Sequence, residues 1–200
     1  MYVINAKEKN ITPLDTVTFK DSGYFERYDI QEWIEGQPDC LGEKLLMIGK
    51  EFSGFDKTND RLDLLAIDKQ GNLVIIENKR DTSGKDVVGQ AIKYAAYCST
   101  MTLDDVSKTA FQSGRYSTVE IARNEIKAFI DNGSEEDILD VLNADQRIII
   151  VSREYTEEAK SAAVWVLNKG IDIKLIEMSL YLYGKEEPKI EFISFNTILP

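Results

Sequence analysis

The sequence predicts a single-domain α/β protein in which helices cover both faces of a mixed sheet. Two neighbouring apolar runs, 62–67 and 73–76, have apolar residues on both faces, which is typical of strands inside a covered sheet. A strand, helix and strand pattern over residues 147–176 predicts a βαβ unit with parallel strands. The 200 residues are enough for one hydrophobic core, and no linker interrupts them.

The individual elements follow from the spacing of the apolar residues. The first helix has Ile30, Trp33 and Ile34 on one face and ends at Gly36, and the polar loop 68–72 has the composition of a hairpin turn. The expected elements, in chain order, are a helix at 25–35, strands at 62–67 and 73–76, a turn at 81–84 that caps the next helix, helices at 86–99, 103–111, 119–130 and 135–142, a strand at 147–152, a helix at 157–168, and strands at 171–176, 180–183 and 190–195. The single domain 1–200 is thereby divided into a core of about 25–100, a helical segment of about 101–145, and a βαβ and hairpin tail of about 146–200.

The composition excludes several kinds of function. The chain carries 24 Lys and Arg against 35 Asp and Glu, a formal net charge of −11. Bulk charge therefore excludes non-specific binding to nucleic acid or to an anionic membrane, although a local basic cluster can oppose the global sign. Histidine is absent, which excludes Ser-His-Asp and Cys-His catalysis and His-ligated zinc. Carboxylates, lysines, hydroxyls and hard metal ions are left to supply any chemistry.

The cysteines and the N-terminus indicate where the protein works. Cys40 and Cys98 form no CxxC motif, which favours a reducing compartment. No stretch approaches the roughly 18 apolar residues of a membrane span, and residues 1–6 lead directly into Lys7 and Glu8 without the apolar region of a signal peptide. We therefore expect a cytoplasmic protein with no membrane partner.

Two acids and a lysine come together in the predicted hairpin. If 68–72 is its loop, paired residue numbers add up to 140, and Asp63 lies directly opposite Glu77 with their Cβ atoms about 4.5–5.5 Å apart. Two such carboxylates repel each other and are costly to bury, so a divalent cation is a natural compensator. Lys79 lies two residues after Glu77 and shares its face of the strand. The set can bind a hard metal ion and stabilise charge on a phosphate.

The same charges also fit a structural role. An ion pair between Asp63 and Lys79, or between Arg61 and Glu77, would need no metal ion. The spacing alone therefore leaves a functional site and a structural ion network open.

Three segments resemble the core of the PD-(D/E)xK nuclease superfamily, and within it the NucS-type and RecB-like nuclease domains. They are the runs 61–68 (RLDLLAID), 72–80 (NLVIIENKR) and 89–94 (GQAIKY). The resemblance covers about residues 26–97. It implies a restriction-endonuclease-like mixed central sheet flanked by helices, to which this chain adds a C-terminal βαβ and hairpin extension. Asn78 departs from the family pattern, which has an apolar residue between the acid and the lysine.

The resemblance also implies roles for particular residues. Asp63 and Glu77 would be metal-binding acids, joined by Glu26 from the first helix, and Lys79 would be the catalytic lysine. Gln90 would belong to a supporting helix motif with Tyr94, although a tyrosine at helical spacing is also typical of a core residue. The implied cofactor is Mg²⁺ or Mn²⁺, the implied partner and substrate is DNA, and the implied activity is metal-dependent hydrolysis of phosphodiester bonds.

Helical geometry gives separate support for Glu26. At 100° per residue, Glu26 lies on the same side as Ile30 and Ile34, whereas Glu32 lies on the opposite side. We therefore expect Glu26 to point inward. The alternative is that Glu26 only interacts favourably with the dipole of its helix.

Two other functions stay open. In the first, the chain is a non-catalytic nucleic-acid-binding or assembly module that keeps the nuclease fold, and Lys79 only neutralises Asp63 and Glu77. In the second, it is a metal hydrolase of small phosphate esters. The apolar C-terminal strands can either form a homodimer interface or complete the sheet.

Overall fold

The computed structural model describes residues 1–52, 61–84, 86–130, 135–184 and 189–200. The helices and strands, in chain order, are β1 (Tyr2–Asn5), β2 (Asn10–Pro13), β3 (Asp15–Val17), the π-helical turn η1 (Glu26–Ile30), α1 (Gln31–Gly36), the 3₁₀ turn η2 (Pro38–Leu41), β4 (Leu46–Phe52), β5 (Leu62–Ile67), β6 (Leu73–Ser83), α2 (Val87–Cys98), α3 (Leu103–Gln112), α4 (Val119–Ile130), α5 (Glu135–Val141), β7 (Gln146–Tyr155), α6 (Glu157–Leu167), β8 (Ile173–Tyr183) and β9 (Ile190–Leu199).

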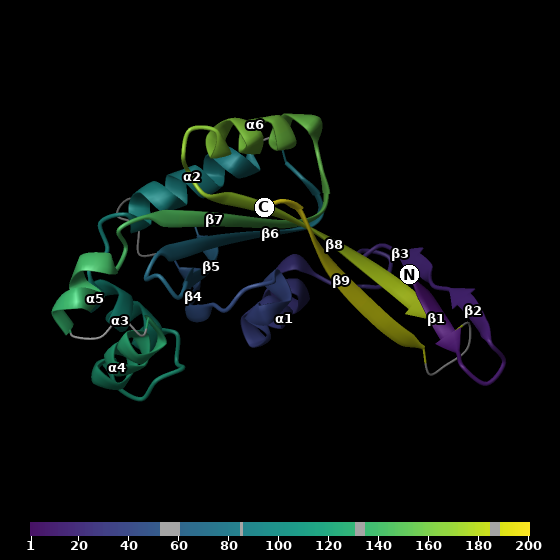
Figure 1. Ribbon diagram of the computed structural model, residues 1–200, viewed down its shortest axis with the longest axis horizontal. Helices are drawn as coiled ribbons and strands as arrows, with labels where there is room; N and C mark the ends of the chain where they lie inside the picture. Colours follow the sequence, from purple (N-terminus) through teal and green to yellow (C-terminus); the bar gives the residue numbers. More distant parts are fainter. Residues whose placement is uncertain (53–60, 85, 131–134, 185–188) are drawn as a thin grey trace.

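A seven-stranded mixed sheet organises the molecule (Figure 1). Its order is β3-β8-β7-β6-β5-β4, and β9 pairs with β8. Strands β6, β7 and β8 are parallel neighbours, and the other pairs are antiparallel. The sequence prediction of a mixed α/β sheet with a βαβ unit is therefore confirmed, with α6 as the crossover helix. No helix within the described residues is long and apolar enough to cross a membrane.

Both faces of the sheet are buried, as the apolar runs predict. On one face, α2, α3, α4 and α6 contribute to a core that includes Ile75 and Ile150. On the other face, η1 and α1 contribute Ile30 and Ile34 to a second core that includes Ile76. Strand β6 therefore lies between two apolar layers, and its end is where the candidate site begins.

The hairpin between β5 and β6 has the predicted loop and register. The paired residues run from Leu64↔Ile76 to Ile67↔Leu73, so their numbers add up to 140. Asp68 fixes the loop because its Oδ1 accepts hydrogen bonds from the backbone N–H groups of Gln70 and Asn72, each at 2.9 Å. Gly71 has a φ of +91°, and a Cβ there would lie 3.1 Å from the carbonyl oxygen of Val141.

The prediction of a turn at 81–84 is wrong for residues 81–83, which belong to a strand. Strand β6 continues to Ser83, and α2 starts after Asp86, whose side chain makes no cap hydrogen bond. The reason is that β7 runs on to Tyr155 and supplies partners for Thr82 and Ser83. Between Lys79 and Thr82 the β6–β7 register shifts by one residue, which marks a β-bulge.

The strands expected at 171–176 and 180–183 form one continuous strand, β8. Its antiparallel partner β9 pairs along it from Tyr183↔Ile190 to Leu175↔Leu199, which removes the expected break. Part of the turn between them, 185–188, lies outside the described residues. The pattern also missed β4 and the N-terminal strands β1, β2 and β3.

Candidate active site

Strands β5 and β6 separate at the position of the predicted acid pair. Their ladder ends at Leu64↔Ile76, one pair before Asp63 and Glu77. The Asp63 side chain bridges the gap, because its Oδ2 accepts a 2.8 Å hydrogen bond from the backbone N–H of Asn78. Gln31 of α1 also donates to the backbone carbonyl of Asp63 at 2.9 Å. These contacts fix Asp63 at the point where the two strands diverge.

Glu77 is fully buried and poorly compensated. Within the described residues, neither of its carboxylate oxygens has a hydrogen-bond partner. The nearest cation is the Lys79 ammonium, whose Nζ lies 3.6 Å from Glu77 Oε2. Burial, together with the negative charge of Asp63, raises the pKa of Glu77 to about 8. The site therefore favours binding of a proton or another cation by Glu77.

Asp63 shares this environment. Burial raises its pKa to about 6, against the opposing effects of the Asn78 N–H and the Lys79 charge. The negative charges of Glu26 and Glu51 raise it further. An acid with ordinary solvation would titrate near 3.8. The two carboxylates thus lie in a pocket of negative potential that one lysine only partly neutralises.

Lys79 lies between two carboxylates. Its Nζ is 3.6 Å from Glu26 Oε1 as well as from Glu77 Oε2, and about a quarter of its side chain is exposed. Burial lowers the pKa of Lys79, but the charges of Glu26, Asp63 and Glu77 outweigh burial and raise it overall. Lys79 is therefore a charged group that is also accessible from outside the site.

Glu26 reaches the site from η1, on the inward side that helical geometry predicts. Its Oε2 accepts a 2.8 Å hydrogen bond from the backbone N–H of Arg80, in the bulged part of β6. Glu32 points elsewhere and accepts a 2.6 Å hydrogen bond from Lys50. The structure thus brings Glu26, Asp63, Glu77 and Lys79 together from three elements.

Gln90 and Tyr94 share a face of α2, as predicted, and they contact each other. Gln90 Nε2 donates to the Tyr94 hydroxyl at 3.1 Å, and no hydrogen bond within the described residues links Gln90 to Glu77, Asp63 or Lys79. Tyr94 is buried in the core cluster on that face of the sheet. The pairing fits a packing role at least as well as a supporting role in the site.

The expected alternative of an Arg61–Glu77 ion pair is not formed. Arg61 Nη1 lies 3.6 Å from Glu51 Oε2, and Arg27 Nη2 lies 3.0 Å from the same oxygen. Glu51 has a left-handed backbone with φ of 51°, which is uncommon for a non-glycine residue and is often found near functional sites. The negative charge of Glu51 acts on Asp63 because β4 pairs with β5, and the sequence alone does not indicate that pairing.

A surface groove leads to Lys79. It has a volume of about 380 Å³ and is lined by Phe25, Glu26, Arg27, Tyr28, Lys79, Arg80, Asp81 and Thr82. We call it the Lys79 groove. Its aromatic residues were also missed at the sequence level, because nothing in their spacing separates them from core positions.

The residues present fit a hard metal ion. Asp63 and Glu77 offer carboxylate oxygens, and both Glu77 oxygens are buried without a hydrogen-bond donor in the described chain. Mg²⁺ needs only one or two protein carboxylates, because water and substrate phosphate complete its coordination. No group of three or more His, Cys, Asp or Glu side chains in the described residues is arranged to hold a metal ion by itself. The pair Asp63 and Glu77 matches the one or two carboxylates that Mg²⁺ needs from a protein.

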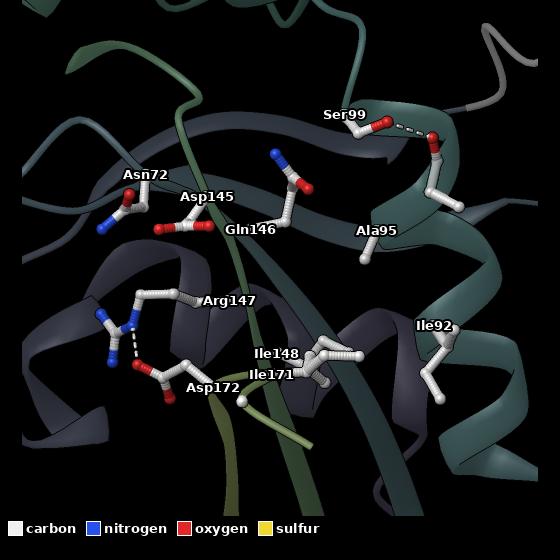
Figure 2. Close-up of a pocket in the computed structure, with 12 residues that line it drawn as sticks. Asn72, Ile92, Ala95, Ser99, Asp145, Gln146, Arg147, Ile148, Ile171 and Asp172 are labelled. Atoms are coloured by element: carbon white, nitrogen blue, oxygen red, sulfur yellow. Dashed lines mark hydrogen bonds and ion pairs between the residues drawn. The ribbon is translucent and has the colours of Figure 1, made fainter. Parts of the chain in front are cut away.

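A second cavity of about 430 Å³ lies at the other end of β7, between α2 and the start of β8 (Figure 2). Two of its charged groups, Arg147 and Asp172, are paired with each other, because Arg147 Nε lies 2.6 Å from Asp172 Oδ2. Arg147 also contacts Glu43 at 2.6 Å and Asp68 at 3.1 Å. This network links the β5–β6 loop to β7, and we interpret it as structural.

Comparison with known proteins gives similarity only to solved structures. No protein-family model and no curated protein match the sequence. An EndoMS–dsDNA2 complex is similar over 76% of this chain and 44% of its own, with 18% identity and a TM-score of 0.43. A repair endonuclease from Pyrococcus abyssi is similar over 74% of this chain and 46% of its own, with 19% identity and a TM-score of 0.41. The chain spans less than half the length of each of these proteins.

Proposed function

We propose that this protein is a metal-dependent nuclease that hydrolyses phosphodiester bonds of DNA. The observation that carries the proposal is the buried Glu77 carboxylate, for which the described residues supply no hydrogen-bond donor in close geometry and which lies beside Asp63 and the charged Lys79. A purely structural site would be expected to satisfy such a group. The match of these residues to the PD-(D/E)xK motif supports the same function.

Asp63 and Glu77 would hold Mg²⁺ or Mn²⁺, and Glu26, whose two oxygens contact Arg80 and Lys79, would act through water. When bound, such an ion polarises the phosphate and makes water a better nucleophile at neutral pH. The N–H of Asn78 holds the Asp63 carboxylate in place. Glu77 is deprotonated when a cation compensates its charge.

Lys79 would act on the substrate directly. Its ammonium group, directed by Glu26 and Glu77, would donate to a phosphate oxygen and stabilise the negative charge that accumulates in the transition state. The Lys79 groove gives the phosphate access from solvent. Arg27 and Arg80 line that groove, and each guanidinium group has more N–H donors than its one carboxylate partner uses, so both can also donate to a phosphate.

One observation favours a second candidate function. Lys79 has both Glu26 and Glu77 within 3.6 Å, so it could serve only to neutralise them. The chain would then be a non-catalytic nucleic-acid-binding or assembly module that keeps the fold.

Cleavage assays distinguish these functions. The pure protein would be incubated with single-stranded, duplex, mismatched and branched DNA in Mg²⁺, in Mn²⁺ and in chelator. Metal-dependent cleavage of DNA supports the nuclease, whereas binding without cleavage in any metal supports the module. Hydrolysis of bis-p-nitrophenyl phosphate without cleavage of any DNA would instead indicate a hydrolase of small phosphate esters.

The sequence leaves open whether the C-terminal strands complete the sheet or form a homodimer interface, and the position of β9 allows both. Among the described strands, β9 pairs only with β8, so its outer edge offers free backbone N–H and C=O groups. Glu191 is the one charged residue of β9. If the β9 strands of two copies pair antiparallel about Ser194, Glu191 of one copy lies opposite Thr197 of the other, so the two Glu191 side chains do not face each other. We propose that two copies pair along this edge.

A further inference from the structure

The Lys79 groove carries two exposed aromatic rings that hydrolysis of a phosphodiester does not require. Phe25 is 56% exposed and Tyr28 is 71% exposed. Their ring centroids are 6.4 Å apart with an interplanar angle of 72°, so the rings pack edge to face on each other rather than into the core. Exposed aromatic residues grouped beside a polar site indicate a contact surface for a ligand.

The local backbone links these rings to the site. The Asp29 side chain accepts a 2.7 Å hydrogen bond from the backbone N–H of Phe25, and the N–H of Ile30 donates to the Phe25 carbonyl at 3.2 Å. Ile30 itself is fully buried. Because Glu26 lies in the same turn and contacts Lys79, the backbone that carries the two rings is held beside Lys79.

Two arginines flank the rings. Arg27 is paired with Glu51 at 3.0 Å, yet half of its side chain is exposed. Arg80 is paired with Asp81 at 2.9 Å. A guanidinium group has five N–H donors, so one carboxylate partner leaves donors for a phosphate. The groove thus combines aromatic faces, which suit a nucleobase, with cations, which suit the sugar-phosphate backbone.

We propose that the Lys79 groove is a nucleotide subsite, in which the base beside the scissile phosphate stacks on Phe25 or Tyr28. Arg27 contacts the backbone phosphate of the same nucleotide. The inference rests on the proposed function for the chemical class of the ligand. One face of that base must be unstacked from its neighbour, because both faces of a base in regular duplex are covered by adjacent base pairs.

Binding without divalent metal tests the subsite separately from cleavage. Fluorescence anisotropy in chelator would compare a labelled 12-nucleotide oligothymidylate with an abasic oligomer of the same length. The wild-type protein should bind the thymidylate more tightly. The double variant Phe25→Ala, Tyr28→Ala should lose about 5- to 150-fold of that affinity, the equivalent of about 1–3 kcal/mol, while its affinity for the abasic oligomer stays the same.

Two further variants separate stacking from charge and from general surface effects. Arg27→Ala should weaken binding of both oligomers alike and lower the slope of log affinity against log salt by about 0.7. Trp165→Ala, which removes an aromatic residue that is 62% exposed on α6, should change neither affinity.

The subsite is refuted if wild-type protein shows no preference for the thymidylate, or if the double variant keeps that preference. Circular dichroism checks that the variants fold, which is expected because both rings are exposed. Cleavage by the wild-type protein in Mg²⁺ is measured separately. If cleavage is absent while the base preference is present and depends on the two rings, the nuclease function fails and the subsite stands.

Discussion

The ammonium nitrogen of Lys79 lies 3.6 Å from Oε2 of Glu77, a fully buried carboxylate that accepts no hydrogen bond from the described residues. At this distance the lysine compensates part of the negative charge but does not satisfy the acid. The raised pKa of Glu77 is the electrostatic consequence.

Replacing Lys79 should stop catalysis without unfolding the protein. Lys79→Ala removes a group that acts mainly on the transition state, so the cleavage rate should fall roughly a hundred- to a thousand-fold, or about 2.7–4 kcal/mol. Glu77 can then take up a proton, which allows the fold to survive. Lys50→Ala is the matched control, because Lys50 also contacts two carboxylates, those of Glu32 and Glu35. Single-turnover rates measure the effect, and undiminished cleavage by Lys79→Ala would sink the mechanism.

Asp63→Asn should abolish binding of divalent ions while leaving metal-free stability unchanged or higher. The amide oxygen can still accept the hydrogen bond from the Asn78 N–H, and the repulsion with Glu77 disappears. Isothermal titration with Mn²⁺ and thermal unfolding in chelator measure the two effects. A clear loss of stability in chelator would instead mean that Asp63 belongs to a stabilising ion network.

Glu26 and Glu32 form a matched pair on one short helical segment. Glu26→Gln should reduce cleavage at saturating Mg²⁺, because Glu26 contacts both Lys79 and the Arg80 N–H. Glu32→Gln should have little effect, because Glu32 pairs with Lys50 on another side. Equal rates for the two variants, or a larger loss for Glu32→Gln, contradict the assignment of Glu26.

Metal-free protein should lose stability as the pH rises from about 5 to about 8. The folded-state pKa values of about 6 for Asp63 and about 8 for Glu77 exceed their ordinary values, so the folded state binds more protons than the unfolded state across this range. The stability is therefore present at the acidic end and is lost as pH rises. At about 1.4 kcal/mol per pKa unit, the loss is on the order of a few kcal/mol.

Urea unfolding in chelator at several pH values measures this dependence. Glu77→Gln should flatten it, and Mg²⁺ should restore stability at the alkaline end. Stability that rises steadily from pH 5 to pH 8 would show that the two acids are satisfied in the folded protein.

Because one edge of β9 has no strand partner among the described residues, we expect the protein to form a dimer whose population rises with concentration. Light scattering after size exclusion should give the mass of two chains, and Ser194→Lys should convert it to one chain because charged residues at a sheet edge oppose edge-to-edge pairing. Ile121→Lys changes an exposed apolar residue on α4 and should leave the mass unchanged. A single-chain mass for the wild-type protein at every concentration excludes this interface.

The parts of the site that depend on local patterns could be predicted from the sequence. The register of the β5–β6 hairpin, in which paired residue numbers add up to 140, follows from the residues of its loop. The inward position of Glu26 follows from the helical spacing of Ile30 and Ile34. Both arguments need only neighbouring residues. This is why the acids and Lys79 could be grouped before the fold was known.

The parts of the fold and site that depend on distant segments could not be predicted from the sequence. Strand β6 runs on past Lys79 because β7, about seventy residues later in the chain, supplies its ladder partners. Glu51 comes near Asp63 through the pairing of β4 with β5, and its φ of 51° has no signature in its residue type. Propensity alone favours a turn at 81–84, and tertiary pairing overrides it.

The bulge in β6 makes chain length near the site more critical than side-chain identity. Between Lys79 and Thr82, β6 has one residue more than β7 needs, and the Arg80 N–H is thereby free to bind Glu26. Deletion of one residue here would restore a regular ladder and turn the following side chains to the opposite face of the sheet. Related sequences that diverge widely at positions 80 and 81 can thus keep the arrangement of Glu26 and Lys79, whereas a sequence shorter by one residue at this point cannot.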